Sequence, residues 1–315
     1  MSLLKNRVFG VYAAAYVLSV VLLVAVEGFS LGEVLLVLGI FGVGLTLLAH
    51  VLCSRARPFH LSVHSGHGEM LLLALGVVAV AAYLTFGFGA ADALTARVLG
   101  HSELAQLVGR AVRKLLLFVL IPAVVFSALF KYSLRDYGLQ FDGAAWRSHV
   151  PVLAGLVLAL VLFQYFLGAG VGPVRRGEFS AGQLAVGLPA VYLWLVIEVG
   201  LVEEFFFRAL LQSRLAAYFK SELSGVVLAS LVFGLAHAPG IYLRGAEAIT
   251  PGGGPPSLVG SVCYSIAILS VTGFFLGLVW ARTRNLLLVM LIHAAGDLLP
   301  NFAQLAGMFG IRGSQ

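Results

Sequence analysis

The sequence predicts an all-α fold, a polytopic bundle of transmembrane helices with about eight or nine spans. Hydrophobic residues make up 60% of the 315-residue chain and charged residues only 11%, whereas soluble domains contain about 25% charged residues. Apolar runs long enough to cross a bilayer, roughly 17–25 residues, recur along the whole chain. We therefore expect a multi-pass integral membrane protein that has the lipid bilayer as a partner.

Nine apolar runs are the expected spans. In chain order they cover residues 8–26, 31–53, 70–87, 115–130, 150–170, 184–207, 223–237, 258–280 and 286–299. The first run follows Lys5 and Arg7, as in a signal peptide, but its apolar core is too long for one and predicts a retained helix. In the eighth run, Gly273 and Gly277 form a GxxxG pattern, which is typical of closely packed membrane helices.

The connections between the runs suggest a division of the chain. Residues 91–114 have mixed polarity and are expected to form a helix at the membrane interface. We therefore divide the chain into an N-terminal extension, residues 1–114, with about three transmembrane helices plus this interfacial segment, and a core, residues 115–315. Residues 250–256 read "TPGGGPP" and are expected to be a flexible loop.

Ionisable residues inside the spans form the candidate functional site. Such groups are costly in a bilayer and usually face a cavity or a partner. The alternative is that they only pair with one another as structural glue, which becomes less plausible for a group gathered in the last four spans. The seven residues are Glu198, Glu203, Glu204, Arg208, His237, His293 and Asp297.

Helix geometry predicts different roles for the two adjacent glutamates. Glu204 and Arg208 are four residues apart and are expected to form an ion pair along one helix face. Glu203 points about 100° away from Glu204, and a poorly solvated carboxylate there is a candidate general base. An antiparallel hairpin with a turn near residues 220–222 would bring His237 to the level of both glutamates.

The histidines lie in two further patterns. Phe233 is one turn before His237, so its ring is expected to buttress the imidazole. Asp297 is one turn after His293 and can orient that imidazole. His293, however, is only some eight residues beyond the turn at residues 282–285, which places it less deeply than the hairpin arithmetic requires.

These motifs resemble the CPBP family, the CAAX-protease-like intramembrane proteases, whose pattern is EExxxR, FxxxH and HxxxN or HxxxD. The corresponding stretches are "EEFFFR" (Glu203, Glu204, Arg208), "FGLAH" (Phe233, His237) and "HAAGD" (His293, Asp297). The resemblance covers about the last 115–130 residues. It implies that Glu203 activates the attacking water, that His237 and His293 stabilise the oxyanion or hold the water, and that Asp297 replaces a frequent asparagine. Glu204, Arg208 and Phe233 would support them.

The resemblance leaves metal dependence open, since the family has been described both as metalloproteases and as glutamate proteases. Glu203, His237 and His293 could hold zinc with one open position. The HExxH spacing of known zinc peptidases is absent, so we expect a metal-free glutamate mechanism and no cofactor.

A second candidate metal site consists of His60, His64 and His67, with Glu69 close behind. The proline and glycines around these residues favour a solvated loop. If this segment does bind metal, the chain could instead be a cation transporter that uses the intramembrane carboxylates and histidines as its path.

The expected function is an intramembrane endopeptidase that cleaves near the membrane in C-terminal tails of membrane-anchored or lipid-modified proteins. The location would be the plasma (inner) membrane in a prokaryote. Nucleic acid is not an expected partner, because the net charge of +6 is spread over loops without a basic stripe. Besides the transporter, a non-catalytic membrane scaffold remains an alternative.

Overall fold

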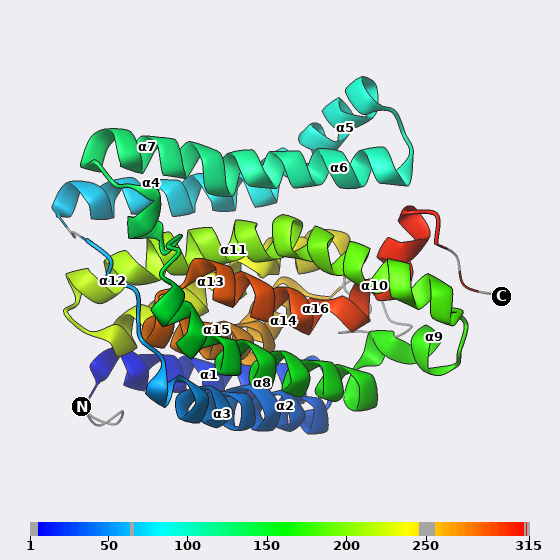
Figure 1. Ribbon diagram of the computed structural model, residues 1–315, viewed down its shortest axis with the longest axis horizontal. Helices are drawn as coiled ribbons and strands as arrows, with labels where there is room; N and C mark the ends of the chain where they lie inside the picture. Colours follow the sequence, from blue (N-terminus) through cyan, green and yellow to red (C-terminus); the bar gives the residue numbers. More distant parts are fainter. Residues whose placement is uncertain (1–5, 64–65, 246–255, 312, 314–315) are drawn as a thin grey trace. The chain divides into compact units, whose positions relative to one another are not determined.

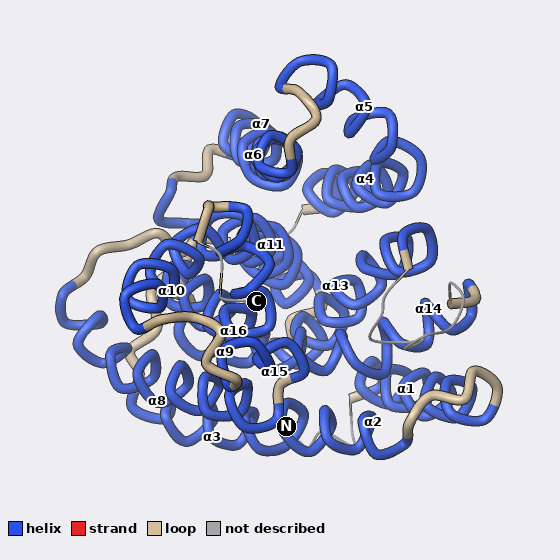
Figure 2. The backbone as a smooth tube through the Cα atoms, turned by 90° about the vertical axis from the view of Figure 1, so that its right-hand side faces the viewer, coloured by secondary structure: helices blue, strands red, loops and turns tan. Residues whose placement is uncertain are grey.

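The computed structural model describes residues 6–63, 66–245, 256–311 and 313. Within these ranges every regular element is helical and no strand occurs (Figures 1 and 2). Nine of the described helices are long and apolar enough to cross a membrane, which confirms the predicted fold class and number of spans. His64 and residues 250–255 of the predicted loop lie outside the described residues.

The chain divides into two compact units. The first unit comprises Met1–Ser54, His60–Gly89 and Phe207–Arg284, and the second comprises Arg55–Phe59, Ala90–Phe206 and Asn285–Gln315. The nine spanning helices are Arg7–Ala25, Leu31–Arg55, His67–Leu99, Glu103–Phe130, Gly143–Leu167, Ala181–Tyr218, Glu222–Leu243, Leu258–Thr283 and Leu286–Met308.

Several of these helices contain more than one element. The α-helices are α1 (Arg7–Ala25), α2 (Leu31–Val37), α3 (Thr46–Leu52), α4 (His67–Ala82), α5 (Phe88–Leu99), α6 (Glu103–Lys114), α7 (Ile121–Phe130), α8 (Gly143–Leu167), α9 (Gly172–Arg175), α10 (Ala181–Leu195), α11 (Val202–Glu204), α12 (Ser213–Tyr218), α13 (Glu222–Arg244), α14 (Leu258–Tyr264), α15 (Ser270–Thr283) and α16 (Leu286–Met308). The π-helical segments are η2 (Leu38–Leu45), η4 (Tyr83–Gly87), η5 (Leu115–Leu120), η8 (Val196–Leu201), η9 (Phe205–Gln212) and η10 (Ser265–Leu269).

Polar side chains fix where many of the helices begin. An oxygen of the capping side chain accepts a backbone N–H of the first turn and so satisfies a donor that the helix cannot pair internally. The capping residues are Asn6, Ser30, Ser102, Asp142, Ser180, Ser221, Ser257 and Asn285. The starts of these helices are thus encoded locally in the sequence.

Glycines allow α13 and α15 to pack closely within the first unit. A Cβ atom on Gly273 would lie 2.9 Å from the ring of Phe233, and one on Gly277 would lie 3.2 Å from a methyl group of Val226. Both distances are too short for a side chain to be added without movement. The close packing predicted from the GxxxG pattern is therefore confirmed.

In the second unit, α16 packs against α8, α10 and η8 (Figure 1). The approach to η8 is closest at Gly200, where an added Cβ atom would lie 2.8 Å from the carbonyl oxygen of Met290. The stripe of α8 formed by Val152, Leu156 and Leu160 is buried. These contacts make α16 the helix around which the second unit is built.

The stretch expected at the membrane interface is part of two long helices. α5 ends the helix His67–Leu99, and α6 runs without a break into η5 and α7, so residue 114 lies inside the helix Glu103–Phe130. Arg113 on α6 forms an ion pair with Asp92 and donates a hydrogen bond to Thr95, both on α5. The domain boundary at residue 114 and the interfacial position of 91–114 stay predictions.

Candidate active site

The two adjacent glutamates lie where the helix Ala181–Tyr218 changes its winding. Glu203 and Glu204 end the short turn α11, which is flanked by the π-helical segments η8 and η9. A π-helix forms i→i+5 hydrogen bonds, occurs mostly as short bulges and is frequent at functional sites. Glu198 lies in η8, five residues before Glu203.

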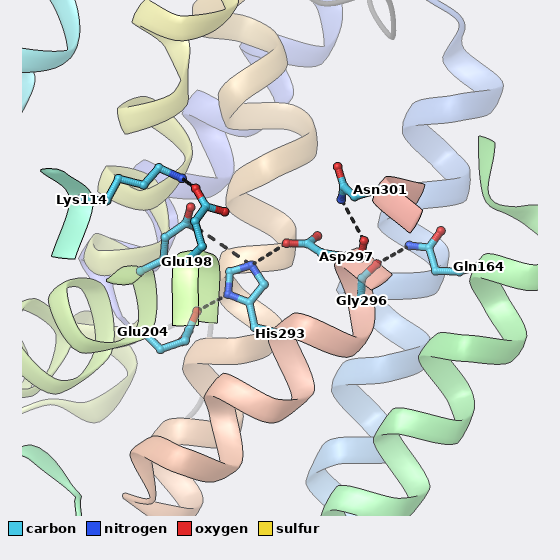
Figure 3. Close-up of polar contacts among 9 residues, drawn as sticks. Lys114, Gln164, Glu198, Glu204, His293, Gly296, Asp297 and Asn301 are labelled. Atoms are coloured by element: carbon cyan, nitrogen blue, oxygen red, sulfur yellow. Dashed lines mark hydrogen bonds and ion pairs between the residues drawn. The ribbon is translucent and has the colours of Figure 1, made fainter. Parts of the chain in front are cut away.

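Glu204 makes a direct polar contact with His293. Its Oε1 atom lies 2.7 Å from Nδ1 of His293 on α16 (Figure 3). The Glu204 side chain is fully buried and His293 is 8% exposed. Because a carboxylate can only accept hydrogen bonds, Nδ1 of His293 carries the proton. The contact therefore fixes both the orientation of the imidazole and its tautomer.

The other nitrogen of His293 faces two further carboxylates. Its Nε2 atom lies 3.6 Å from Oδ2 of Asp297 and 4.0 Å from Oε2 of Glu203. Neither distance is that of a direct hydrogen bond. Two carboxylates therefore lie within 4.0 Å of the same ring nitrogen.

The three carboxylates differ in their access to the surroundings. The exposed fraction of the side chain rises from 0% for Glu204 to 16% for Glu203 and 36% for Asp297. Glu204 is thus sealed behind His293, whereas Glu203 and Asp297 can be reached. This arrangement suits a buried orienting group behind two accessible ones.

An ion pair lies next to this cluster. Nζ of Lys114, the last residue of α6, contacts Oε1 of Glu198 (Figure 3). The sequence identified Glu198 as an acid within a span but assigned it no partner, and it placed Lys114 in the interfacial segment. No local spacing signal connects two residues that are 84 positions apart.

Two side-chain amides brace α16 beside Asp297. Gln164 on α8 donates from Nε2 to the carbonyl oxygen of Gly296 over 3.0 Å, and Asn301 donates to the carbonyl oxygen of Asp297 over 2.8 Å (Figure 3). Sequence reasoning missed both amides. A signal for the first was present, because Pro300 has no N–H to offer to the carbonyl four residues before it.

The remaining motif residues belong to the first unit. The ring of Phe233 lies 5.0 Å from that of His237, which confirms the predicted neighbours. Nδ1 of His237 lies 2.8 Å from the carbonyl oxygen of Phe233, so Nδ1 donates there and Nε2 is left for other contacts. Arg208 places its guanidinium 4.9 Å from the Phe233 ring centroid, a cation–π geometry. The predicted convergence of His237 on Glu203, and the ion pair of Arg208 with Glu204, stay predictions.

The described residues contain no group of three or more His, Cys, Asp or Glu side chains arranged to hold a metal ion. His60 lies in a non-helical stretch, as expected for a loop. The prediction of a solvated loop is wrong for His67 and Glu69: His67 begins α4 and stacks edge-on against Tyr218, and Glu69 is buried in the same first turn. The zinc alternative at Glu203, His237 and His293 stays a prediction, and so does the one at the second histidine cluster, whose His64 lies outside the described residues.

Comparison with sequence families gives one match. Residues 185–299 match the family described as type II CAAX prenyl endopeptidase Rce1-like. Comparisons with curated proteins and with solved structures found no match. The matched region includes all the motif residues, whereas Lys114 and Gln164 lie outside it. From residue 185 to residue 299, the chain therefore carries a domain of the Rce1-like type II CAAX prenyl endopeptidase family, also known as CPBP.

Proposed function

We propose that this protein is an intramembrane endopeptidase that hydrolyses a peptide bond close to the membrane, in C-terminal tails of membrane-anchored or lipid-modified proteins. Membership of its domain in a family of prenyl endopeptidases supports protease activity on protein substrates. The nine candidate spans support a site within a multi-pass membrane protein. Such a site suits substrates whose cleavage point is held at the membrane by their own anchor.

One observation carries the proposal: the carboxylates of Glu203 and Asp297 lie 4.0 Å and 3.6 Å from the same atom, Nε2 of His293. Both distances exceed that of a direct hydrogen bond, and both carboxylates accept hydrogen bonds. A water molecule donates two protons, so it is the natural occupant of a point surrounded by acceptors. A water held in this way has its oxygen lone pairs directed away from the carboxylates, towards an incoming carbonyl group.

The proposed reaction assigns a proton to each step. Glu203 removes a proton from the water as the oxygen attacks the carbonyl carbon. The resulting oxyanion accepts hydrogen bonds from Nε2 of His237 and from Nε2 of His293; both rings are protonated before the attack, so each donates from both of its nitrogens. Glu203 then returns its proton to the leaving amide nitrogen as the C–N bond breaks. Asp297 orients the water, and Glu204 holds the His293 ring.

The test uses the purified full-length protein in proteoliposomes with two internally quenched peptides. One peptide carries a farnesylated C-terminal CAAX sequence, and the other has the same sequence without the lipid. We expect the wild-type protein to cleave at least the farnesylated peptide and the Glu203→Gln variant to lose more than about 100-fold in kcat. The Glu103→Gln variant is a matched control, because Glu103 is an exposed residue at the start of α6.

Cleavage by Glu203→Gln at the wild-type rate would exclude Glu203 as the base. If the wild-type protein cleaves neither peptide, the membrane proteomes of cells that contain the wild-type protein or the Glu203→Gln variant are compared. If no membrane-protein tail remains uncut in the variant, the proposed activity is wrong.

A further inference from the structure

The proline in α16 leaves a backbone group to be satisfied close to the site. In a regular helix the carbonyl oxygen of Gly296 would accept the N–H of residue 300. That residue is Pro300, which has no N–H and whose ring crowds the carbonyl four residues earlier. Residue 300 therefore cannot donate the usual backbone hydrogen bond to the carbonyl of Gly296.

Gln164 satisfies this carbonyl from the neighbouring helix. Its Nε2 atom donates to the Gly296 oxygen over 3.0 Å. Gln164 continues the four-residue spacing of Val152, Leu156 and Leu160, the stripe of α8 that is buried in the second unit. A leucine at position 164 would also extend this apolar stripe, so packing alone does not call for an amide there.

The supported peptide group lies within the site. The carbonyl of Gly296 belongs to the peptide bond that joins Gly296 to Asp297, so its orientation sets the direction in which the Asp297 residue leaves the helix. The next carbonyl, that of Asp297 itself, accepts from the Asn301 side chain over 2.8 Å. Asp297 thus lies between two peptide groups that are both fixed by side-chain amides.

A second polar contact already docks α8 on α16 at the other side of His293. The Nδ2 atom of Asn285 donates to Nδ1 of His149 over 2.9 Å, and Nε2 of His149 bonds the carbonyl oxygen of Arg57. Asn285 also caps α16 through Leu288. Because the Asn285–His149 contact already holds α8 against α16, the Gln164 contact is not needed for docking the two helices and can serve to position the backbone at Gly296.

We propose that Gln164 is a positioning residue of the active site: by donating to the carbonyl that Pro300 leaves without a backbone donor, it holds Asp297 beside Nε2 of His293. Gln164 lies outside the matched family region and acts on the reaction only through the backbone of α16. Its kinetic consequence depends on the proposed peptidase function, whereas its effect on the backbone does not.

The test pairs a lesion with its repair in the full-length protein. Gln164→Leu removes the donor, and Pro300→Ala in the same chain restores a backbone N–H to the Gly296 carbonyl. Gln304→Leu is the control, because it makes the same replacement at an exposed position of α16. Two readouts are taken: hydrogen–deuterium exchange of the peptide spanning residues 293–301, and kcat and KM on the farnesylated quenched peptide.

We expect Gln164→Leu to speed exchange in this peptide and to lower kcat by about 10- to 100-fold with KM within about twofold, as for a small displacement of a catalytic group. The double variant should regain most of both properties, and the control should resemble wild type. The proposal is overturned if Gln164→Leu changes neither readout, or if Pro300→Ala fails to repair the exchange. If the wild-type protein cleaves no peptide, the exchange readout still decides the positioning role, and only the proposed function fails.

Discussion

The two adjacent glutamates should separate stability from activity when each is changed to glutamine. Glu204 is fully buried and lies 2.7 Å from His293, whereas Glu203 is 16% exposed and 4.0 Å from the same ring. Glutamine keeps the size of the side chain and removes its charge. The two variants therefore compare a direct charged hydrogen bond with a longer-range contact on one helix.

The expected magnitudes follow from these distances. Glu204→Gln exchanges a hydrogen bond to a charged group, typically about 1.5–3 kcal/mol, for a neutral one of about 0.5–1.5 kcal/mol, so a loss of about 1–1.5 kcal/mol is expected. In Glu203→Gln, loss of the 4.0 Å contact with His293 should contribute less than about 0.5 kcal/mol, because that contact is not a direct hydrogen bond. Activity should follow a different order, with Glu203→Gln inactive and Glu204→Gln slowed about tenfold as the imidazole loses its fixed orientation.

The assay measures reversible unfolding in mixed micelles by SDS titration, together with peptide cleavage and the ¹⁵N chemical shifts of the His293 ring. The Nδ1 signal of His293 should show the hydrogen bond to the Glu204 carboxylate in wild type and should shift in Glu204→Gln, where this charged partner is lost. Equal destabilisation by the two variants would refute the assignment of Glu204 as the buried orienting group. So would an unchanged Nδ1 signal of His293 in Glu204→Gln.

Three further outcomes are expected. Asp297→Asn should keep at least about a tenth of the wild-type kcat, because an amide can still orient a water, whereas Asp297→Ala should lose more than about 100-fold in kcat. Equal activities of the two variants in the quenched-peptide assay would contradict the role of Asp297. Lys114→Met removes the cation that pairs with Glu198 and should destabilise the protein by about 1–3 kcal/mol, less than for a fully buried pair because Lys114 is 31% exposed. Adding Glu198→Gln should recover most of this loss in SDS titrations. Dialysis against 1,10-phenanthroline should leave cleavage unchanged; a loss that zinc reverses would instead assign a metal mechanism.

Much of the fold follows from hydropathy, because long apolar helices are stable in a bilayer and few other structures satisfy their backbone hydrogen bonds there. The nine spans, the loop around His60 and the close packing at Gly273 and Gly277 were all predictable from composition and spacing. Helix ends were equally accessible, since serine, asparagine and aspartate caps act within three residues of where they stand.

The partners of the charged groups were harder to predict. The i,i+4 rule pairs Glu204 with Arg208, the nearest cation along the same helix. Such a rule gives no information about partners on another helix, and His293, which contacts Glu204, is 89 residues away in the sequence. The π-helical turns around Glu203 could not be predicted, because the spacing of hydrophobic residues in the sequence does not distinguish them from α-helical turns. His293 reaches Glu204 even though it lies only eight residues beyond its turn, since contact between two helices depends on how they are tilted and spaced as well as on residue counts.

Gly200 lets the helix that carries Glu203 and Glu204 lie directly against α16. Its hydrogen atom stands where a methyl group would meet the main chain at Met290, one turn before His293. Alanine at this position should push η8 away from α16 and so separate the Glu204 carboxylate from His293, although no titratable side chain is changed. Under the proposed function, such a variant would bind a substrate protein without cleaving it and could be used to isolate that substrate.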